Sequence, residues 1–187
     1  MIRAFPKVAV QCPEANLVIF GTGVLQPYLE KMIKDCGLED NVLLYGFSNK
    51  LVKYISNSAV FAFPSVYEGF GTALQEALAC DVACVCTDYQ SGGSEIMEPD
   101  QVPITNVTHA KYGIMVPACS RVKSDAFADL EKSEDDMAKA LIMLLQNKEL
   151  RESYAKKARE RAGIYDIENI IKQWLAVFEK RSEKIYE

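Results

Sequence analysis

Five short apolar segments that alternate with helical patterns constrain the fold of this chain more than any other feature. They are residues 17–20, 42–46, 59–63, 82–86 and 113–116. Short, uniformly apolar runs are typical of strands buried on both faces, and their alternation with helices produces a parallel sheet. A chain of 187 residues can bury one core, so a single domain is expected. The sequence therefore predicts an α/β domain, a parallel sheet with helices on both faces.

The C-terminal third is predicted to be helical after one irregular segment. That segment runs from Ala118 to Lys132 and mixes charges of both signs, so we expect a solvated, mobile loop there. Ser133 and Asp136 approximate a capping box for the helix that follows. A last helix is expected after Asp166, and its Trp174 is predicted to be a packing residue.

Composition excludes two classes of partner. The net charge of −5 and the pI near 5.1 argue against a nucleic-acid-binding protein, which normally carries a surplus of lysine and arginine. The apolar runs are far shorter than the roughly 20 residues that cross a bilayer, and no signal-peptide core is present. We therefore expect a cytoplasmic protein.

The six cysteines indicate neither disulfides nor a zinc site. No Cys-x-x-Cys pair occurs, and Cys84 and Cys86 fall within an apolar segment, where a free thiol behaves as a small apolar residue. His109, the only histidine, lies in a polar stretch and is predicted to be a solvated loop residue. Free thiols in this number fit a reducing compartment.

A glycine-flanked turn is the strongest candidate for a binding site. Two carboxylates, Glu68 and Glu76, bracket it, and it joins the apolar run 59–63 to good helix formers from Thr72 to Ala79. Gly69 and Gly71 would let a ligand approach the backbone, while the first free amides of the helix would face an anion. The acids are too far apart in sequence to share one proton, so we expect them to hold different parts of one ligand.

The strand, the turn and the paired glutamates resemble the donor-binding half of retaining glycosyltransferases of family 4, whose Glu, seven residues, Glu signature would be Glu68 and Glu76. Further blocks resemble the same family in order: 17–23, 41–47, 87–88 with 92–96, and 112–117. The widened interval Tyr89-Gln90-Ser91 resembles the subgroup that builds bacterial cell-surface polysaccharides. The resemblance implies a Rossmann-like parallel sheet, the C-terminal half of a GT-B glycosyltransferase.

The resemblance also implies roles for individual residues. Glu68 would be the catalytic residue, in contact with the transferred sugar, and Glu76 would accept hydrogen bonds from the ribose hydroxyls. Weaker candidates lie after the first two strands. The implied substrate-binding residues are, besides Glu76, Gly69, Phe70, Gly71 and Thr72 for the sugar and distal phosphate, Phe47 and Ser48 for the base, and Gly21 and Gly23 for close packing or ligand approach.

Part of the family pattern has no counterpart here. The opening residues 1–8 resemble the helix after the first strand of the donor domain, so that strand, the diphosphate-clamping Arg and Lys, and the N-terminal acceptor domain are expected to be missing. The resemblance thus implies that residues 1–187 are a nucleotide-sugar-binding domain truncated at its N-terminus, inactive alone. In the full-length enzyme this domain would be cytoplasmic, and a peripheral position at the inner face of the membrane is an open alternative.

The expected substrate is a nucleotide diphosphate sugar, with UDP favoured, and the expected acceptor is a glycan or a lipid-linked molecule in polysaccharide biosynthesis. No cofactor and no metal are expected, because the Asp-x-Asp pair of metal-dependent sugar transferases is absent from the sequence. Two alternative functions stay open, because the fold does not decide between them. One is an epimerase or phosphorylase of the same architecture, and the other is a non-catalytic α/β interaction module.

Overall fold

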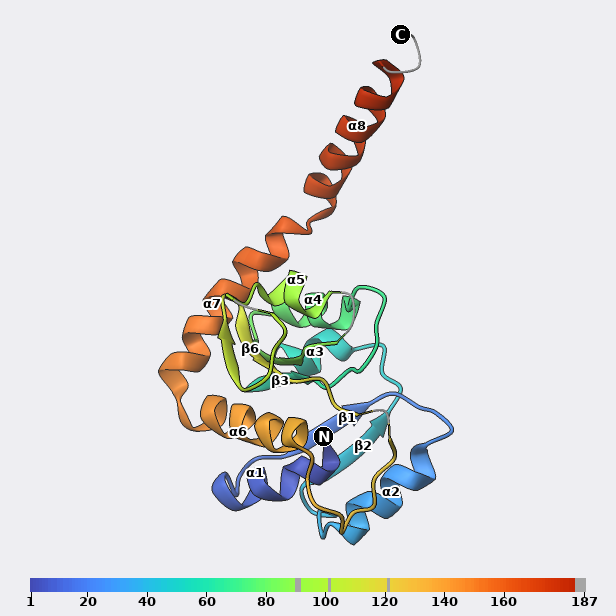
Figure 1. Ribbon diagram of the computed structural model, residues 1–187. Coiled ribbons are helices and arrows are strands. Elements are labelled where there is room, and N and C mark those ends of the chain that lie inside the picture. Colours follow the sequence, from blue (N-terminus) through green and yellow to red (C-terminus); the bar gives the residue numbers. More distant parts are fainter. Residues whose placement is uncertain (90–91, 101, 121, 184–187) are drawn as a thin grey trace.

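The computed structural model describes residues 1–89, 92–100, 102–120 and 122–183. It contains the predicted alternation of strands and helices (Figure 1). The strands are β1 (Leu17–Phe20), β2 (Val42–Gly46), β3 (Val60–Phe63), β4 (Ala83–Thr87), β5 (Thr108–Ala110) and β6 (Gly113–Val116). The helices are η1 (Ile2–Ala4), α1 (Phe5–Gln11), α2 (Gln26–Asp35), α3 (Leu51–Ile55), α4 (Thr72–Ala79), α5 (Gly93–Met97), α6 (Lys132–Gln146), α7 (Lys148–Ile164) and α8 (Ile167–Glu183). All five predicted strands are confirmed to within one residue at each end.

The strands form two sheets where the sequence predicts one. β1 pairs with β2 in parallel, and β3, β4, β6 and β5 form a second sheet in that order. The contacts of β3 with β4 and of β4 with β6 are parallel, as predicted. Within the described residues, β1 pairs only with β2, and β3 only with β4, so each of β1 and β3 keeps one unpaired edge there.

A strand that the sequence did not predict, β5, pairs antiparallel with β6. It contains His109, which corrects the expectation of a loop histidine: the residue is exposed, but it lies in an edge strand, and its Nδ1 is 2.9 Å from the Tyr154 hydroxyl. The strand is short and mostly polar, so it lacks the apolar pattern that identifies the buried strands.

Two apolar cores lie on opposite faces of the larger sheet. Successive residues of β4 alternate between them: Ala83 and Val85 belong to the cluster with α1 and α6, whereas Cys84 and Cys86 belong to the cluster with α4 and α5. Both thiols are fully buried, and this burial raises the pKa of each. The expectation that these cysteines act as small apolar residues is therefore confirmed.

The last helix contradicts one prediction. Trp174 is 58% exposed, and on α8 its ring stacks on Phe178 at 5.8 Å between centroids. Figure 1 shows α8 extending away from the body of the molecule. Its amphipathic pattern predicted burial, but that pattern requires only an apolar covering and does not specify that the same chain supplies it. None of the helices described is long and apolar enough to span a bilayer.

The irregular segment before α6 has no helix or strand in its described residues and is mostly exposed, as expected of a solvated loop, but it also contacts the start of the chain. Arg3 of η1 reaches across to it and donates hydrogen bonds to the carbonyl oxygens of Asp125, Ala128 (3.3 Å) and Asp129 (2.8 Å). The same guanidinium forms a buried ion pair with Glu134 at 2.9 Å. Arg121, like Gln90 and Ser91 of the widened interval, lies outside the described residues.

The cap of α6 also differs from the prediction. Glu131 is the N-cap, and Glu134 is the residue whose side chain returns to the N-cap amide, at 2.9 Å. The reciprocal pair therefore starts two residues before Ser133, which is buried. Glu134 serves both the cap and Arg3, so one carboxylate joins the start of the chain to the start of α6.

We expect Arg3→Met to lower the free energy of unfolding by about 3 kcal/mol, because it leaves Glu134 and three carbonyl oxygens without their buried donor. Lys7→Met, which removes an exposed ion pair with Asp135, is the matched control and should cost much less. Urea denaturation measures both variants. Equal losses would show that the buried contact contributes no more than the exposed one.

Acid should weaken the same contact. Burial disfavours the charged form of Glu134, yet the hydrogen bonds from Arg3 and from the Glu131 amide outweigh it and hold the pKa of Glu134 below its usual value. A lowered pKa gives stability that is fully present above the unfolded value of about 4.3 and is lost as the pH falls through the folded value. The stability difference between the parent chain and Arg3→Met should therefore shrink in acid, as urea denaturation below pH 4 would measure. A constant difference would contradict this.

Candidate functional site

The glycine-flanked turn connects β3 to α4, as the sequence predicts. α4 begins at Thr72, and its N-cap is Gly71, which has φ of 92° in the left-handed region. As the N-cap, Gly71 has no side chain with which to cap this end. The first amides of a helix have no acceptor within it, so those of Thr72 and Ala73 can donate to a ligand. The local geometry thus places helical amide donors at the end of a parallel strand.

Glu68 is positioned by the ends of two neighbouring strands. The hydroxyl of Ser65 donates to Oε1 of Glu68 at 2.6 Å. Ser65 is itself fixed, because the buried hydroxyl of Thr87 at the end of β4 contacts its carbonyl oxygen and that of Phe63. A relay from Thr87 through Ser65 therefore restrains the carboxylate, which is half-buried. Neither Ser65 nor Thr87 was among the predicted site residues.

Gly71 is required by packing, and its predicted role in ligand approach stays a prediction. The side chain of Tyr89 lies against it: a Cβ built at Gly71 would overlap the Tyr89 hydroxyl and lie 3.1 Å from Cζ. That hydroxyl donates to the carbonyl oxygen of Phe70 at 3.0 Å, and burial raises the pKa of Tyr89. Gly69 is different, because a Cβ there would meet nothing within 4 Å. Of the two glycines, Gly69 leaves room for a ligand.

A second glycine loop, between β4 and α5, packs on the first. Gly92 has φ of 134°, and a Cβ there would lie 2.7 Å from the carbonyl oxygen of Phe70. Asp88, directly after β4, accepts hydrogen bonds from the Ser94 hydroxyl at 2.9 Å and the Ile104 amide at 3.0 Å. The candidate site therefore includes a loop that sequence reasoning recognised only as a family block. The consecutive glycines that follow a buried strand were the sequence signal from which this loop could have been predicted as part of the site.

Three predicted residues of the turn and helix face outward. Thr72 and Glu76 are exposed on α4, and the carboxylate of Glu76 has no hydrogen bond or ion pair within the described part of the chain. The ring of Phe70, 38% exposed, contacts Tyr165 edge-on at 5.3 Å between centroids. The assignment of Glu76 to a ribose stays a prediction, and its carboxylate is available for such a contact.

The remaining predicted residues lie on the smaller sheet, after β1 and β2. Gly21 donates its amide to the carbonyl oxygen of Gly46 at 2.8 Å, and a Cβ at Gly21 or Gly23 would meet nothing within 4 Å. Phe47 is 81% exposed, and Ser48 accepts a hydrogen bond from the Lys50 amide at 3.1 Å. Figure 1 shows the chain leaving β1, β2 and β3 toward one side of the molecule.

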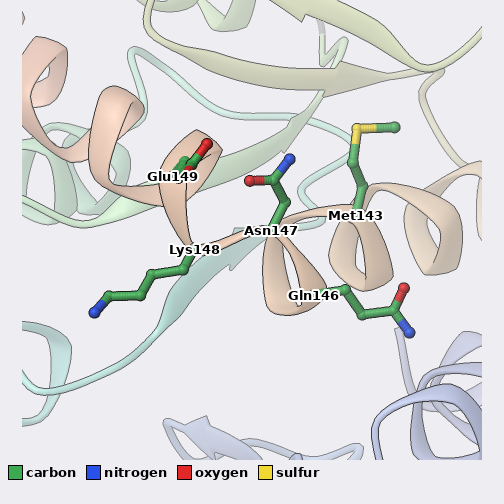
Figure 2. A pocket seen from close by; sticks show the side chains of 5 residues that line it. All are labelled: Met143, Gln146, Asn147, Lys148 and Glu149. Atoms are coloured by element: carbon green, nitrogen blue, oxygen red, sulfur yellow. The ribbon is translucent and has the colours of Figure 1, made fainter.

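A large hollow of about 1430 Å³ lies beside the two sheets. It is lined by both β1 and β3 and extends to Ser65, Val66 and Ala73, but neither Glu68 nor Glu76 lines it. A second, shallower depression of about 520 Å³ lies where α6 meets α7, and Figure 2 shows the polar ends of its side chains, including Lys148 and Glu149, spread apart. Nothing in that arrangement converges on a ligand.

No group of three or more His, Cys, Asp or Glu in the described residues is placed to hold a metal ion. The absence of a metal therefore stays an expectation for the bound enzyme. What the turn offers chemically is a set of backbone amides, one restrained carboxylate and one exposed carboxylate at the end of a parallel strand, the usual position of ligands in open α/β sheets.

Comparison with known proteins adds a family match. The model of the family described as glycosyl transferases group 1 matches residues 1–161. The chain is 36% identical over 166 residues to the N-acetylgalactosamine-N,N'-diacetylbacillosaminyl-diphospho-undecaprenol 4-alpha-N-acetylgalactosaminyltransferase of Campylobacter jejuni, covering 89% of this chain and 38% of the relative. It is 32% identical over 187 residues to an uncharacterized glycosyltransferase of Methanocaldococcus jannaschii, covering 96% of this chain and 45% of the relative.

Among solved structures, the crystal structure of TarM aligns with a TM-score of 0.75 at 26% identity, covering 95% of this chain and 31% of TarM. Another structure, of a TarM mutant from S. aureus, contains Fondaparinux, alpha-GlcNAc-glycerol and UDP. The pneumococcal O-GlcNAc transferase GtfA, at 22% identity and a TM-score of 0.74, shows the same fold. The chain spans less than half the length of the curated relatives named above. The expected fold, an α/β domain like those of GT-B glycosyltransferases, is confirmed.

We expect Gly71→Ala to lower the free energy of unfolding by about 1–3 kcal/mol, because the new methyl group overlaps the Tyr89 hydroxyl and the backbone has positive φ. Gly69→Ala is the control and should be nearly neutral. Adding Tyr89→Phe to Gly71→Ala should recover part of the loss, as a double-mutant cycle followed by thermal unfolding would measure. Strict additivity of the two substitutions would contradict the proposed contact.

Proposed function

This chain belongs to the glycosyl transferases group 1 family, and from that premise we propose that it is the donor-binding half of a retaining glycosyltransferase of family 4. The donor is a nucleotide diphosphate sugar. The observation that carries the proposal is the turn between β3 and α4 at the carboxyl end of a parallel strand, where Glu68 precedes the first amides of α4 and Glu76 lies on the exposed face of that helix. The family match covers every predicted site residue.

The amides from Gly69 to Thr72 are proposed to hold the distal phosphate and the sugar. A diphosphate that leaves during transfer gains negative charge, and backbone donors at a helix start stabilise such charge without reorganisation. This supports a reaction that needs no metal ion and no cofactor, which we propose for the enzyme. UDP is the proposed nucleotide, and its presence in the TarM mutant structure supports that choice.

The two carboxylates are proposed to act on different parts of the donor. Glu68, restrained by Ser65, would lie beside the transferred sugar and stabilise positive charge at the reacting carbon. Glu76, exposed on α4, would accept two hydrogen bonds from ribose hydroxyls, as an ionised carboxylate can. Phe47, Ser48, Gly21 and Gly23 would meet the donor from the smaller sheet, with the first two nearest the base.

The acceptor is proposed to bind to a part of the enzyme outside this chain, in an N-terminal domain. Relatives named in the comparisons act on a diphospho-undecaprenol-linked sugar in Campylobacter jejuni and on poly(ribitol-phosphate) in Staphylococcus aureus. These names support a glycan or a lipid-linked acceptor in polysaccharide biosynthesis. Without the acceptor domain, the chain alone is expected to bind donor weakly and to transfer no sugar. Membership of a transferase family favours this function over an epimerase, a phosphorylase or a non-catalytic interaction module.

In the full-length enzyme, Glu76→Ala should weaken UDP affinity by at least about tenfold, because it removes hydrogen bonds to a charged group. Glu149→Ala, at the remote depression between α6 and α7, is the matched control and should leave affinity unchanged. Isothermal titration with UDP measures both. Unchanged affinity for Glu76→Ala would refute the ribose assignment.

Glu68→Gln should separate binding from chemistry. The amide keeps the size of the side chain and its contact with Ser65 but loses the charge, so UDP affinity should stay within about twofold while sugar transfer falls by about 100-fold or more. Titration and a transfer assay on the same preparation give the two numbers. A loss of affinity equal to the loss of transfer would place Glu68 in donor binding alone.

A further inference from the structure

A buried charge lies on α7, the helix that packs against α4 at one face of the larger sheet (Figure 1). Tyr154, Ala158 and Arg161 are the buried residues of α7, at the spacing of a single helical stripe. Arg161 is only 6% exposed, and an arginine at such a position costs free energy unless its guanidinium is paired and hydrogen-bonded. Its partners therefore explain why a charge stands in this stripe.

The guanidinium of Arg161 satisfies the end of the short helix α5. Its Nε donates to the carbonyl oxygen of Ile96 at 2.9 Å, and it also donates to the carbonyl oxygen of Glu95. The last carbonyl groups of a helix have no donor within it, and an arginine side chain can supply one. Glu98, the C-cap of α5, balances the charge, with Oε1 2.5 Å from Nη1 of Arg161. Arg161 therefore fixes the end of α5 that is farther from Gly92.

The same guanidinium reaches the turn after β3 through Tyr165, the C-cap of α7. Nη2 of Arg161 donates to the Tyr165 hydroxyl at 2.8 Å. The ring of Tyr165 contacts the ring of Phe70 edge-on, at 5.3 Å between centroids. Burial raises the pKa of Tyr165, although the Arg161 charge lowers it, so the phenol is uncharged at neutral pH. Arg161 thus contacts α5 directly and the turn through one uncharged ring.

We propose that Arg161 and Tyr165 are positioning residues, which hold the turn after β3 and the start of α5 at a fixed spacing. The contacts form a closed ring. Gly92 lies against the carbonyl group of Phe70, and Tyr165 lies against its side chain. Arg161 connects Tyr165 back to α5, which starts directly after Gly92. The turn cannot move relative to α5 without breaking a contact in this ring.

The consequence for the donor rests on the proposed function. Gly69 and Thr72, on either side of the Phe70–Gly71 pair, belong to the amides proposed to hold the distal phosphate and the sugar. Amides that bind an anion without reorganisation must already be in place, and a displacement of about 1 Å can cost about 100-fold in rate. Arg161 and Tyr165 would act through Phe70 and not by contact with the donor.

Hydrogen exchange of the full-length enzyme without ligand tests the ring of contacts. The amides of Leu74 and Ile96 report on its two parts, because they donate to the carbonyl oxygens of Gly71 and Gly92. Arg161→Lys keeps the charge but loses the planar fork that serves several acceptors at once. We expect it to speed the exchange of both amides at least about tenfold.

Arg159→Met is the matched control for this arm. Arg159 is exposed on the same helix and forms an ion pair with Asp81, away from the ring of contacts. Its replacement should leave the exchange of Leu74 and Ile96 unchanged. Unchanged exchange of both amides in Arg161→Lys, or equally fast exchange in Arg159→Met, overturns the proposal.

Isothermal titration with UDP separates positioning from a merely structural role. Tyr165→Leu removes the ring beside Phe70 and should weaken UDP affinity at least about fivefold, because the amides that bind the distal phosphate are no longer preorganised. Tyr165→Phe keeps that ring and should recover most of the loss. Partial unfolding would lower the number of binding sites and leave their affinity unchanged. That result for Tyr165→Leu overturns the positioning role.

The two arms also distinguish this inference from the proposed function. Faster exchange in Arg161→Lys, in an enzyme whose parent form does not bind UDP, would leave the hold on the turn standing and count against the donor assignment. Unchanged exchange in an enzyme that binds UDP would do the reverse.

Discussion

The contact between the Tyr89 hydroxyl and the turn after β3 is the constraint on which the candidate site depends. The hydroxyl donates to the Phe70 carbonyl oxygen and occupies the space that a side chain at residue 71 would need. Gly92 approaches that same carbonyl from the other loop. Two loops after adjacent parallel strands are thereby locked together, and the helix that follows the first of them starts with free amides aimed outward. Glycine is needed at residues 71 and 92 because the Tyr89 side chain and the Phe70 backbone occupy the space that a side chain would take. This packing fixes the position of the turn from which α4 starts.

The two carboxylates, Glu68 and Glu76, differ in how firmly they are held and in how exposed they are. Glu68 is attached through Ser65 and Thr87 to strand ends that the core makes rigid, whereas Glu76 stands on the exposed face of α4. A group that stabilises charge at a reacting carbon must be held within a fraction of an ångström, and the hydrogen-bond relay supplies that rigidity. A group that holds ribose hydroxyls needs reach and solvent access before the ligand arrives. The turn and the helix after it thus provide one restrained and one exposed carboxylate, which suits the two roles proposed for them.

Much of the fold could be predicted from the sequence because buried parallel strands are uniformly apolar, and five such runs were evident. The failures have different physical causes. β5 is a polar edge strand, and Trp174 belongs to an amphipathic helix whose pattern is the same whether or not the chain covers it. Arg3 resembles any surface arginine until Glu134 and three carbonyls are placed around it. In the site, the glutamates and glycines carried a motif, but Ser65, Thr87 and Tyr89 act through contacts between strands that no spacing encodes.

β1 and β3 belong to different sheets and are not paired with each other in the described structure. Each sheet is held by its own pairing, and the elements that bridge them are η1 with Arg3, α1 and α6 on one face. Arg3 therefore does more than order a loop: it fastens the segment before α6 to the start of the chain at the border of the hollow. Helices that cover one face can keep two half-sheets roughly aligned, but only main-chain hydrogen bonds fix register, because they act residue by residue. The spacing between the residues after β1 and β2 and the residues after β3 is therefore set by the side-chain packing of these helices.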